Sequence, residues 1–205
     1  MGLKPLLTFE WIGASFLCCD MLKIIPAENE KHFTTAREMM LEYAAWLEFK
    51  LCFQGFDEEL RDLPGKYAAP AGRLLLALWN DEPAGMGALR PLDQGGESGA
   101  CEMKRLYVRP GFRGHSIGRA LAEKLIQEAR EIGYRIMRLD TVPGKMDSAI
   151  ALYRELGFEE ISPYYKTPVA GTLFMELVLR QGRELLEIQK DCAANSRSNR
   201  SEKDA

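Results

Sequence analysis

The segment of this chain best suited to chemistry joins a short strand to a helix through a loop rich in small residues. It runs from Val108 to Leu121, reads VRPGFRGHSIGRAL and has glycine at positions 111, 114 and 118. Such a loop directs successive main-chain N–H groups toward one point, and the positive end of the helix dipole adds to their attraction for an anion. Small residues let a phosphate approach the main chain closely. The segment therefore predicts an anion site of a kind suited to a pyrophosphate.

Two other interpretations of this loop stay open on the spacing alone. The glycines can serve the turn and nothing else. Alternatively, Asp140 lies 22 residues beyond Gly118 and ends the next predicted strand, where a dinucleotide-binding unit carries the acidic residue that holds a ribose. The full G-x-G-x-x-G pattern is absent, however, and a predicted hairpin precedes the strand, which argues against a dinucleotide site.

The elements that must position these residues follow from apolar periodicity and turn residues. Strands are expected at 22–25, 73–79, 84–89, 101–108, 135–142, 158–161 and 172–179, and helices at 34–50, 117–132 and 147–156, with a helical turn at 57–63. Period-two alternation would place Glu102, Lys104, Leu106 and Val108 on one face of their strand, and Met103, Arg105 and Tyr107 on the other. The Met and aromatic stripe of helix 34–50 is interpreted as core packing.

In their order along the chain, the loop and the Tyr153 segment resemble the GNAT superfamily of N-acyltransferases. The CoA loop of that family follows a Gln/Arg-x-x-Gly-x-Gly/Ala pattern after a strand that ends Tyr-Val-x-Pro. Here Arg113 takes the first position and Gly118 the last, while Ser116 replaces the usual middle glycine. The later segment AIALYRELGF is similar to the family's Ala-x-x-Leu-Tyr-x-x-x-Gly-Phe helix. Met146 stands seven residues before the tyrosine, where many members have asparagine.

This resemblance implies roles for the candidate residues. Main-chain groups of Leu106 and Val108 would bind the pantetheine arm of acetyl-CoA. The main chain of the loop would bind the pyrophosphate through Arg113, Gly114, His115, Ser116, Ile117 and Gly118, with the His115 ring exposed and not catalytic.

By the resemblance, Tyr153 would protonate the departing thiolate, a role that suits a hydroxyl that stays protonated at neutral pH, although a lone helical tyrosine often only packs. Glu102 matches the strand position from which some members supply a base, and partial burial there would raise the pKa of its carboxylate. An ion pair with Lys104 or Arg105 explains Glu102 equally well, and Asp140 is the reserve candidate for the base.

The resemblance also implies a fold and a reaction. We expect a mixed α/β sheet with the GNAT-like acyl-CoA N-acyltransferase fold, as a single domain over 21–180. The strands that end near Val108 and Leu139 would run parallel and splay apart. The expected activity is direct transfer of an acetyl group from acetyl-CoA to a primary amine of a small molecule or peptide. A non-catalytic CoA-binding regulatory module is the alternative.

Composition and charge narrow the remaining possibilities. A formal net charge of −3 gives no basic footprint for nucleic acid, and five cysteines without ligand spacing, with only two histidines, predict no metal site and a reduced, cytoplasmic setting. The apolar stretch from Leu6 to Cys19 is interrupted by Glu10, is too short to span a membrane and is followed by no small-x-small cleavage site, so residues 1–20 are expected to be an extension outside the fold. Residues 181–205 are expected to be a polar tail. A homodimer stays open, and acceptor selectivity is expected around Trp46, Phe53, Phe56, Tyr164 and Tyr165.

Overall fold

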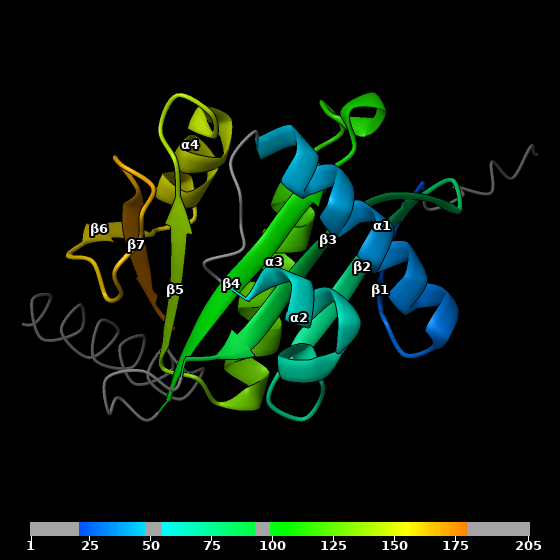
Figure 1. Ribbon diagram of the computed structural model, residues 1–205, viewed down its shortest axis with the longest axis horizontal. Coiled ribbons are helices and arrows are strands. Elements are labelled where there is room, and N and C mark those ends of the chain that lie inside the picture. The colour runs from blue at the N-terminus through cyan, green and yellow to red at the C-terminus, as the bar shows by residue number, and fades with distance from the viewer. Residues whose placement is uncertain (1–20, 48–54, 93–98, 180–205) are drawn as a thin grey trace, which may run out of the picture.

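Seven strands form one sheet in the order β1-β2-β3-β4-β5-β7-β6 in the computed structural model, which describes residues 21–47, 55–92 and 99–179 (Figure 1). Every neighbouring pair is antiparallel except β4 and β5, which are parallel. The strands are β1 Leu22–Pro26, β2 Arg73–Trp79, β3 Glu82–Pro91, β4 Ala100–Val108, β5 Ile136–Thr141, β6 Glu159–Ile161 and β7 Leu173–Val178. The expected mixed α/β fold is confirmed.

Helices cover both faces of this sheet and divide the core into two layers (Figure 1). One face carries α1 (Glu30–Leu47), α2 (Phe56–Arg61) and the short turn η2 (Gly65–Tyr67); the other carries η3 (Pro110–Phe112), α3 (Ile117–Ile132) and α4 (Asp147–Glu155). Buried side chains of α1 pack with one set of strand residues, and those of α3 with the set that points the other way. The alternation of strand side chains thus supplies both layers.

The first helix begins four residues before its predicted start at 34. The side-chain oxygen of Asn29 accepts a hydrogen bond from the main-chain N–H of His32 at 3.0 Å, which caps the first turn. Apolar periodicity is weak in that turn, so the cap and not the stripe fixes where α1 begins. The predicted helical stretch 57–63 is shorter and is followed by η2, which the sequence analysis did not predict.

A β-bulge in β4 overturns the expected alternation of that strand. Met86 pairs with Tyr107 and Ala88 with Lys104, so Gly87 alone faces both Arg105 and Leu106. Arg105 takes a φ of 57°, a left-handed conformation that costs a non-glycine residue about 1 kcal/mol. The bulge therefore sends Lys104 and Arg105 to the same face of the sheet.

The grouping predicted for β4 is consequently wrong at its C-terminal end. Met103 packs in the α3 layer together with Leu106 and Val108, whereas Tyr107 packs in the α1 layer. Glu102 is thus separated from Leu106 and Val108, with which the simple alternation had placed it. One extra residue in the strand reverses the facing of everything that follows it.

The parallel pair β4–β5 separates soon after it forms. Its register runs over three pairs, Ala100↔Ile136, Cys101↔Met137 and Glu102↔Arg138, and pairing then stops. Beyond this point the two strands diverge (Figure 1). The expected splay between the strands ending near Val108 and Leu139 is confirmed.

Some expectations lie outside the described residues. They concern the extension 1–20, the tail 181–205, the end of the helix predicted to reach residue 50, and Phe53. Among the described residues, no helix is long and apolar enough to cross a membrane.

Candidate active site

The divergence of β4 and β5 opens a cavity of about 640 Å³. Its walls come from α1, from both splayed strands, from the loop before α3 and from α4. Seven of the predicted ligand-binding residues line it: Leu106, Val108, Arg113, Gly114, Ser116, Ile117 and Gly118. Tyr153 and Asp140 line it as well, whereas Glu102 and His115 do not.

One end of the cavity is formed by the N-terminus of α3, which presents unpaired main-chain donors. The N–H of Ala120 bonds to the Ser116 carbonyl at 3.0 Å. Within the described chain, the N–H groups of the preceding residues Ile117, Gly118 and Arg119 find no main-chain acceptor, and no side chain caps the helix. An anion at this point would satisfy them and interact favourably with the helix dipole. The arrangement fits a pyrophosphate.

The small residues of this loop serve two different purposes. Gly114 has a φ of 86° and Ser116 a φ of 57°, so the turn itself requires left-handed conformations at both; this explains why glycine suits position 116, and the serine adopts the same geometry. Gly118 is different: a Cβ built there would meet only Val108 Cγ2, at an ordinary 3.7 Å. The protein has room for a side chain at 118, so the space in front of this glycine is available to a ligand.

His115 contributes its main chain to this loop and turns its ring elsewhere. The ring lies 4.5 Å from that of Trp79, centroid to centroid, and its Nδ1 is 3.2 Å from the Phe112 carbonyl oxygen. It is exposed and absent from the lining of the cavity.

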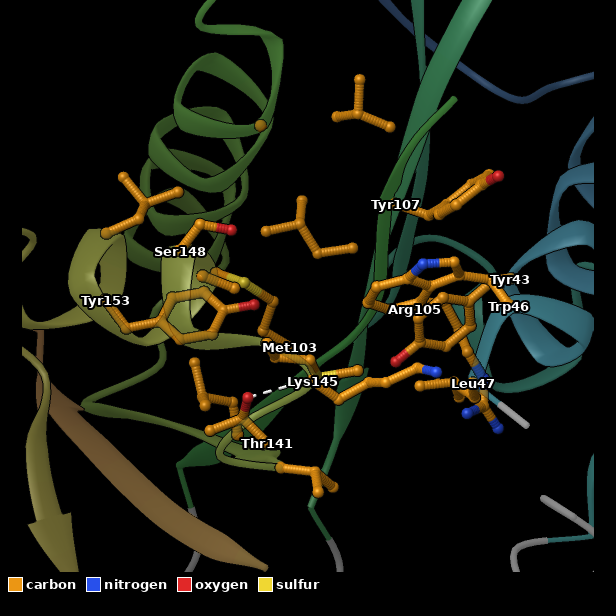
Figure 2. Close-up of a pocket in the computed structure, with 18 of the residues that line it drawn as sticks. Tyr43, Trp46, Leu47, Met103, Arg105, Tyr107, Thr141, Lys145, Ser148 and Tyr153 are labelled. Carbon is orange, nitrogen blue, oxygen red and sulfur yellow. Dashed lines mark hydrogen bonds between the residues drawn. The ribbon is translucent and has the colours of Figure 1, made fainter. Parts of the chain in front are cut away.

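Tyr153 lies on the α4 wall with its hydroxyl directed into the cavity (Figure 2). Its ring is buried against Phe158, with centroids 5.7 Å apart. Burial raises the pKa of this hydroxyl above its ordinary value, because a phenolate would be poorly solvated there. Among the described residues the hydroxyl has no hydrogen-bond partner, so it is a protonated donor available to a bound group.

Met146, which departs from the family pattern given above, also lines the cavity. The Thr141 hydroxyl donates to its sulfur at 3.3 Å. Thr141 is 1% exposed, so the thioether supplies the acceptor that this buried hydroxyl needs.

The other end of the cavity is an ionic cluster built from side chains. Lys104 Nζ lies 2.6 Å from Asp140 Oδ1 and 3.7 Å from Glu102 Oε1. Arg90 Nη2 lies 2.7 Å from the second Glu102 oxygen, and the Tyr164 hydroxyl donates to Oε1 at 2.8 Å. Glu102 is 1% exposed and is held behind Lys104, so the ion-pair interpretation describes its surroundings.

Asp140 is the carboxylate that reaches the cavity. Burial would raise its pKa, but the Lys104 ammonium and a hydrogen bond from Tyr165 outweigh burial and hold that pKa below its ordinary value. Asp140 is therefore ionised at neutral pH. Its ion pair with Lys104, together with a sheet that has one parallel pair among its described strands, removes the support for the dinucleotide interpretation.

Charged residues next to this cluster connect the bulge of β4 to α2. Arg105 donates from Nε and Nη2 to the two oxygens of Glu59, each at 2.8 Å, and lies over the Phe56 ring at 5.1 Å. This bidentate pair holds the strained residue of the bulge in place. Phe56 is buried beneath the pair and does not line the cavity.

Sequence reasoning missed part of the site on α1. Tyr43 and Trp46 belong to the stripe that was interpreted as core, yet both line the cavity. Trp46, already considered for acceptor selectivity, lies under Arg113 at 5.4 Å and Lys145 at 5.6 Å. The rings of Tyr43 and Trp46 stack on each other with centroids 6.3 Å apart. By contrast, Met39 and Met40 in the same stripe are fully buried. The stripe therefore divides between core and cavity, which its periodicity could not show.

The described part of the chain contains no group of three or more His, Cys, Asp or Glu side chains placed to hold a metal ion.

Comparisons with known proteins agree with this geometry. Residues 38–158 match the Acetyltransferase (GNAT) family. An uncharacterized N-acetyltransferase of Schizosaccharomyces pombe is 38% identical over 140 residues, covering 68% of this chain and 83% of the relative. An uncharacterized N-acetyltransferase of Dictyostelium discoideum is 31% identical and covers 68% and 91%. An IAA acetyltransferase of Azospirillum brasilense is 38% identical over 112 residues, or 53% and 69% of the two chains.

Solved structures share the fold. A GNAT-family acetyltransferase of Staphylococcus aureus has a TM-score of 0.63 at 23% identity, covering 78% of this chain and 99% of that one. A Salmonella typhimurium acetyltransferase, solved with acetyl-CoA, has a TM-score of 0.55 at 23% identity and covers 78% and 95%.

Proposed function

Because the chain belongs to the GNAT family and is an acetyl-CoA-dependent N-acetyltransferase, we propose that the cavity between β4 and β5 is its active site and that Tyr153 and Asp140 carry the proton transfers. The observation that supports this most directly is that the unpaired donors of α3, the Tyr153 hydroxyl and the Asp140 carboxylate all meet one cavity. The acceptor is proposed to be a primary amine.

Acetyl-CoA is proposed to bind along two walls of the cavity, the loop before α3 and the end of β4. Its pyrophosphate would lie at the main chain of 113–118, where donors are unpaired and the space before Gly118 is open. Its pantetheine arm would follow the free edge of β4 at Leu106 and Val108, past the point where β5 has left it. Acetyl-CoA bound at this site supplies the thioester. The protein must orient that thioester and stabilise the charges that develop during acetyl transfer.

Three groups would stabilise these charges or transfer protons: a main-chain N–H of β4, the Tyr153 hydroxyl and the Asp140 carboxylate. The bulge leaves an extra residue outside the β3–β4 ladder, and we propose that a main-chain N–H of this segment polarises the thioester carbonyl. The amine nitrogen bonds to the carbonyl carbon, the carbon–sulfur bond breaks, and the sulfur takes the proton of the Tyr153 hydroxyl. The proton lost by the nitrogen leaves through Asp140 or through water next to it.

Asp140 and Glu102 are proposed to have different roles where the acceptor amine binds. Asp140 faces the cavity and, being ionised, accepts a hydrogen bond from the amine, whereas Glu102 holds Lys104 and thereby Asp140. Glu102 is then a positioning residue. The sequence-based assignment of Glu102 as the base stays a prediction, and the geometry favours Asp140.

The kind of amine and the setting of the reaction are also proposals. Known structures of similar fold include ribosomal-protein-alanine N-acetyltransferases, which keeps a peptide amine among the candidates, and a small-molecule amine stays a prediction. The free, buried Cys101 supports a reducing, cytoplasmic setting. A homodimer remains a prediction.

A turnover screen with Tyr153→Phe tests the proposal. Release of CoA from acetyl-CoA would be measured across amines, amino acids and peptides. Tyr153→Phe removes only the hydroxyl, so turnover should fall by roughly 100-fold, the usual scale for a lost proton donor, while acetyl-CoA affinity holds. Tyr134→Phe is the control, because its hydroxyl bonds to the Ala71 carbonyl away from the cavity. Full turnover in Tyr153→Phe would overturn the assignment.

A further inference from the structure

Two phenol hydroxyls face each other across the cavity, and the mechanism above uses only one. Tyr153 comes from the α4 wall, and Tyr43 comes from α1 on the opposite wall (Figure 2). Both hydroxyls are directed into the space between the walls. The two phenols are close enough to affect one another electrostatically.

The Tyr43 hydroxyl has unused hydrogen-bonding capacity. Within the described part of the chain it makes no hydrogen bond, although its ring contacts Trp46 and Tyr107 at centroid distances of 6.3 and 5.8 Å. Burial raises its pKa above the ordinary value, while the charge of Arg105 acts in the opposite direction. The Tyr43 side chain is only partly buried and its hydroxyl faces the cavity, so this unused hydrogen-bonding capacity is open to a ligand that enters there.

The side from which Tyr43 enters indicates which ligand this is. The proposed acetyl-CoA site belongs to the α3 and α4 side of the sheet, whereas α1 lies on the other face (Figure 1). The charged groups whose fields reach the Tyr43 hydroxyl are Arg105 and Asp140, and Asp140 is the carboxylate proposed to meet the amine. A nucleophile must approach the thioester from the side that the cofactor leaves open, which is the α1 side.

We propose that Tyr43 is a positioning residue for the acceptor, whose hydroxyl accepts a hydrogen bond from the incoming amine while Asp140 accepts a second one. Two acceptors on different elements fix the direction of the nitrogen lone pair toward the thioester carbonyl. Tyr43 exchanges no proton with the substrate. This inference rests on the proposed function, because it requires the acceptor to enter the same cavity.

The test is Tyr43→Phe, which keeps the ring contacts with Trp46 and Tyr107 and removes the hydroxyl alone. We expect kcat/KM for a primary amine taken from the screen to fall about 5- to 10-fold, the scale of one neutral hydrogen bond, mainly through KM. Calorimetry with that amine in the presence of CoA should show a matching loss of affinity. The affinity for acetyl-CoA, and its slow hydrolysis without any amine, should not change.

Tyr107→Phe is the matched control. Tyr107 contacts Tyr43, but its hydroxyl is directed away from the cavity and hydrogen-bonds Glu42 (Figure 2). This variant should keep wild-type kinetics. The pH profile gives a further distinction: Tyr43 stays protonated throughout the working range, so Tyr43→Phe should lower the rate by the same factor at every pH.

Three results would overturn the inference. Wild-type kinetics and amine affinity in Tyr43→Phe would show that the ring only packs. An equal loss of acetyl-CoA hydrolysis would place the hydroxyl on the acetyl group, and an altered pH profile would make it an acid or base. Failure of the proposed function itself looks different, because the wild-type protein would then release no CoA in response to any amine.

Discussion

The two ends of the cavity differ in which parts of the protein form them, main chain at one end and side chains at the other. The anion end is one continuous run of main chain, 113–118, whose side chains matter little beyond their size. The acceptor end combines side chains of Tyr43, Lys104 and Asp140, which come from three elements far apart in the sequence. The first end should therefore be sensitive to shape and the second to charge and hydroxyl groups.

The largest expected effect is at the anion end. Gly118→Glu fills the open space before the helix and adds a negative charge where phosphates bind, so the acetyl-CoA dissociation constant should rise at least about 100-fold. Calorimetry on the folded variant checks this. Gly111→Ala is the control, because a Cβ at 111 meets nothing within 4 Å. If Gly118→Glu binds acetyl-CoA normally, the loop is assigned to the wrong ligand.

At the acceptor end, a change of charge should affect turnover and leave cofactor affinity intact. Asp140→Asn should lower kcat/KM for the amine by about 100-fold, the low end of the contribution of a positioned general base. Glu102→Gln should cost only a few-fold, because Arg90 and Tyr164 still hold the side chain. The opposite ranking, with Glu102→Gln the more damaging, would restore Glu102 as the base.

Lowering the pH should reduce the stability of the folded protein, because two carboxylates at or near the acceptor end lose their charge. The pKa values of Asp140 and Glu59 lie below their ordinary values of 3.8 and 4.5, because Lys104 and Arg105 outweigh the opposing effect of burial. Each contribution to stability is complete above the unfolded pKa and is lost as the pH falls through the lower folded pKa. The free energy of unfolding should thus decline from about pH 5 downward, as denaturant titrations can measure. Asp140→Asn should flatten this decline.

The smallest effect is expected from removing 1–20 and 181–205. The described residues that line the cavity all belong to the intervening stretch, so the trimmed protein should keep its melting temperature and turnover within experimental error. A lowered melting temperature, measured calorimetrically, would show that one of these segments stabilises the domain.

The same contrast explains what the sequence could predict. The loop 113–118 and Tyr153 belong to local patterns, in which spacing along the chain determines position in space, and both line the cavity. The facing of Glu102 relative to Leu106 depends on the bulge, which lies opposite Gly87 of the neighbouring strand, where a Cβ would meet the Leu106 side chain at 3.2 Å. Tyr43 and Met40 share one helical stripe, and only the packing of the sheet beneath decides which lies in the core. These parts needed tertiary structure.

The brief pairing of β4 with β5 has a mechanical consequence. Three register pairs join a four-stranded half-sheet, β1 to β4, to a three-stranded one, β5 to β7. At this joint the Cys101 thiol donates to the Ile136 carbonyl at 3.4 Å. Because the joint is short, a small change in the angle between the two half-sheets would displace their far ends more than the joint itself. The width of the cavity therefore depends on how the two half-sheets pack at this joint, where Cys101 and Met137 pair outside the lining of the cavity.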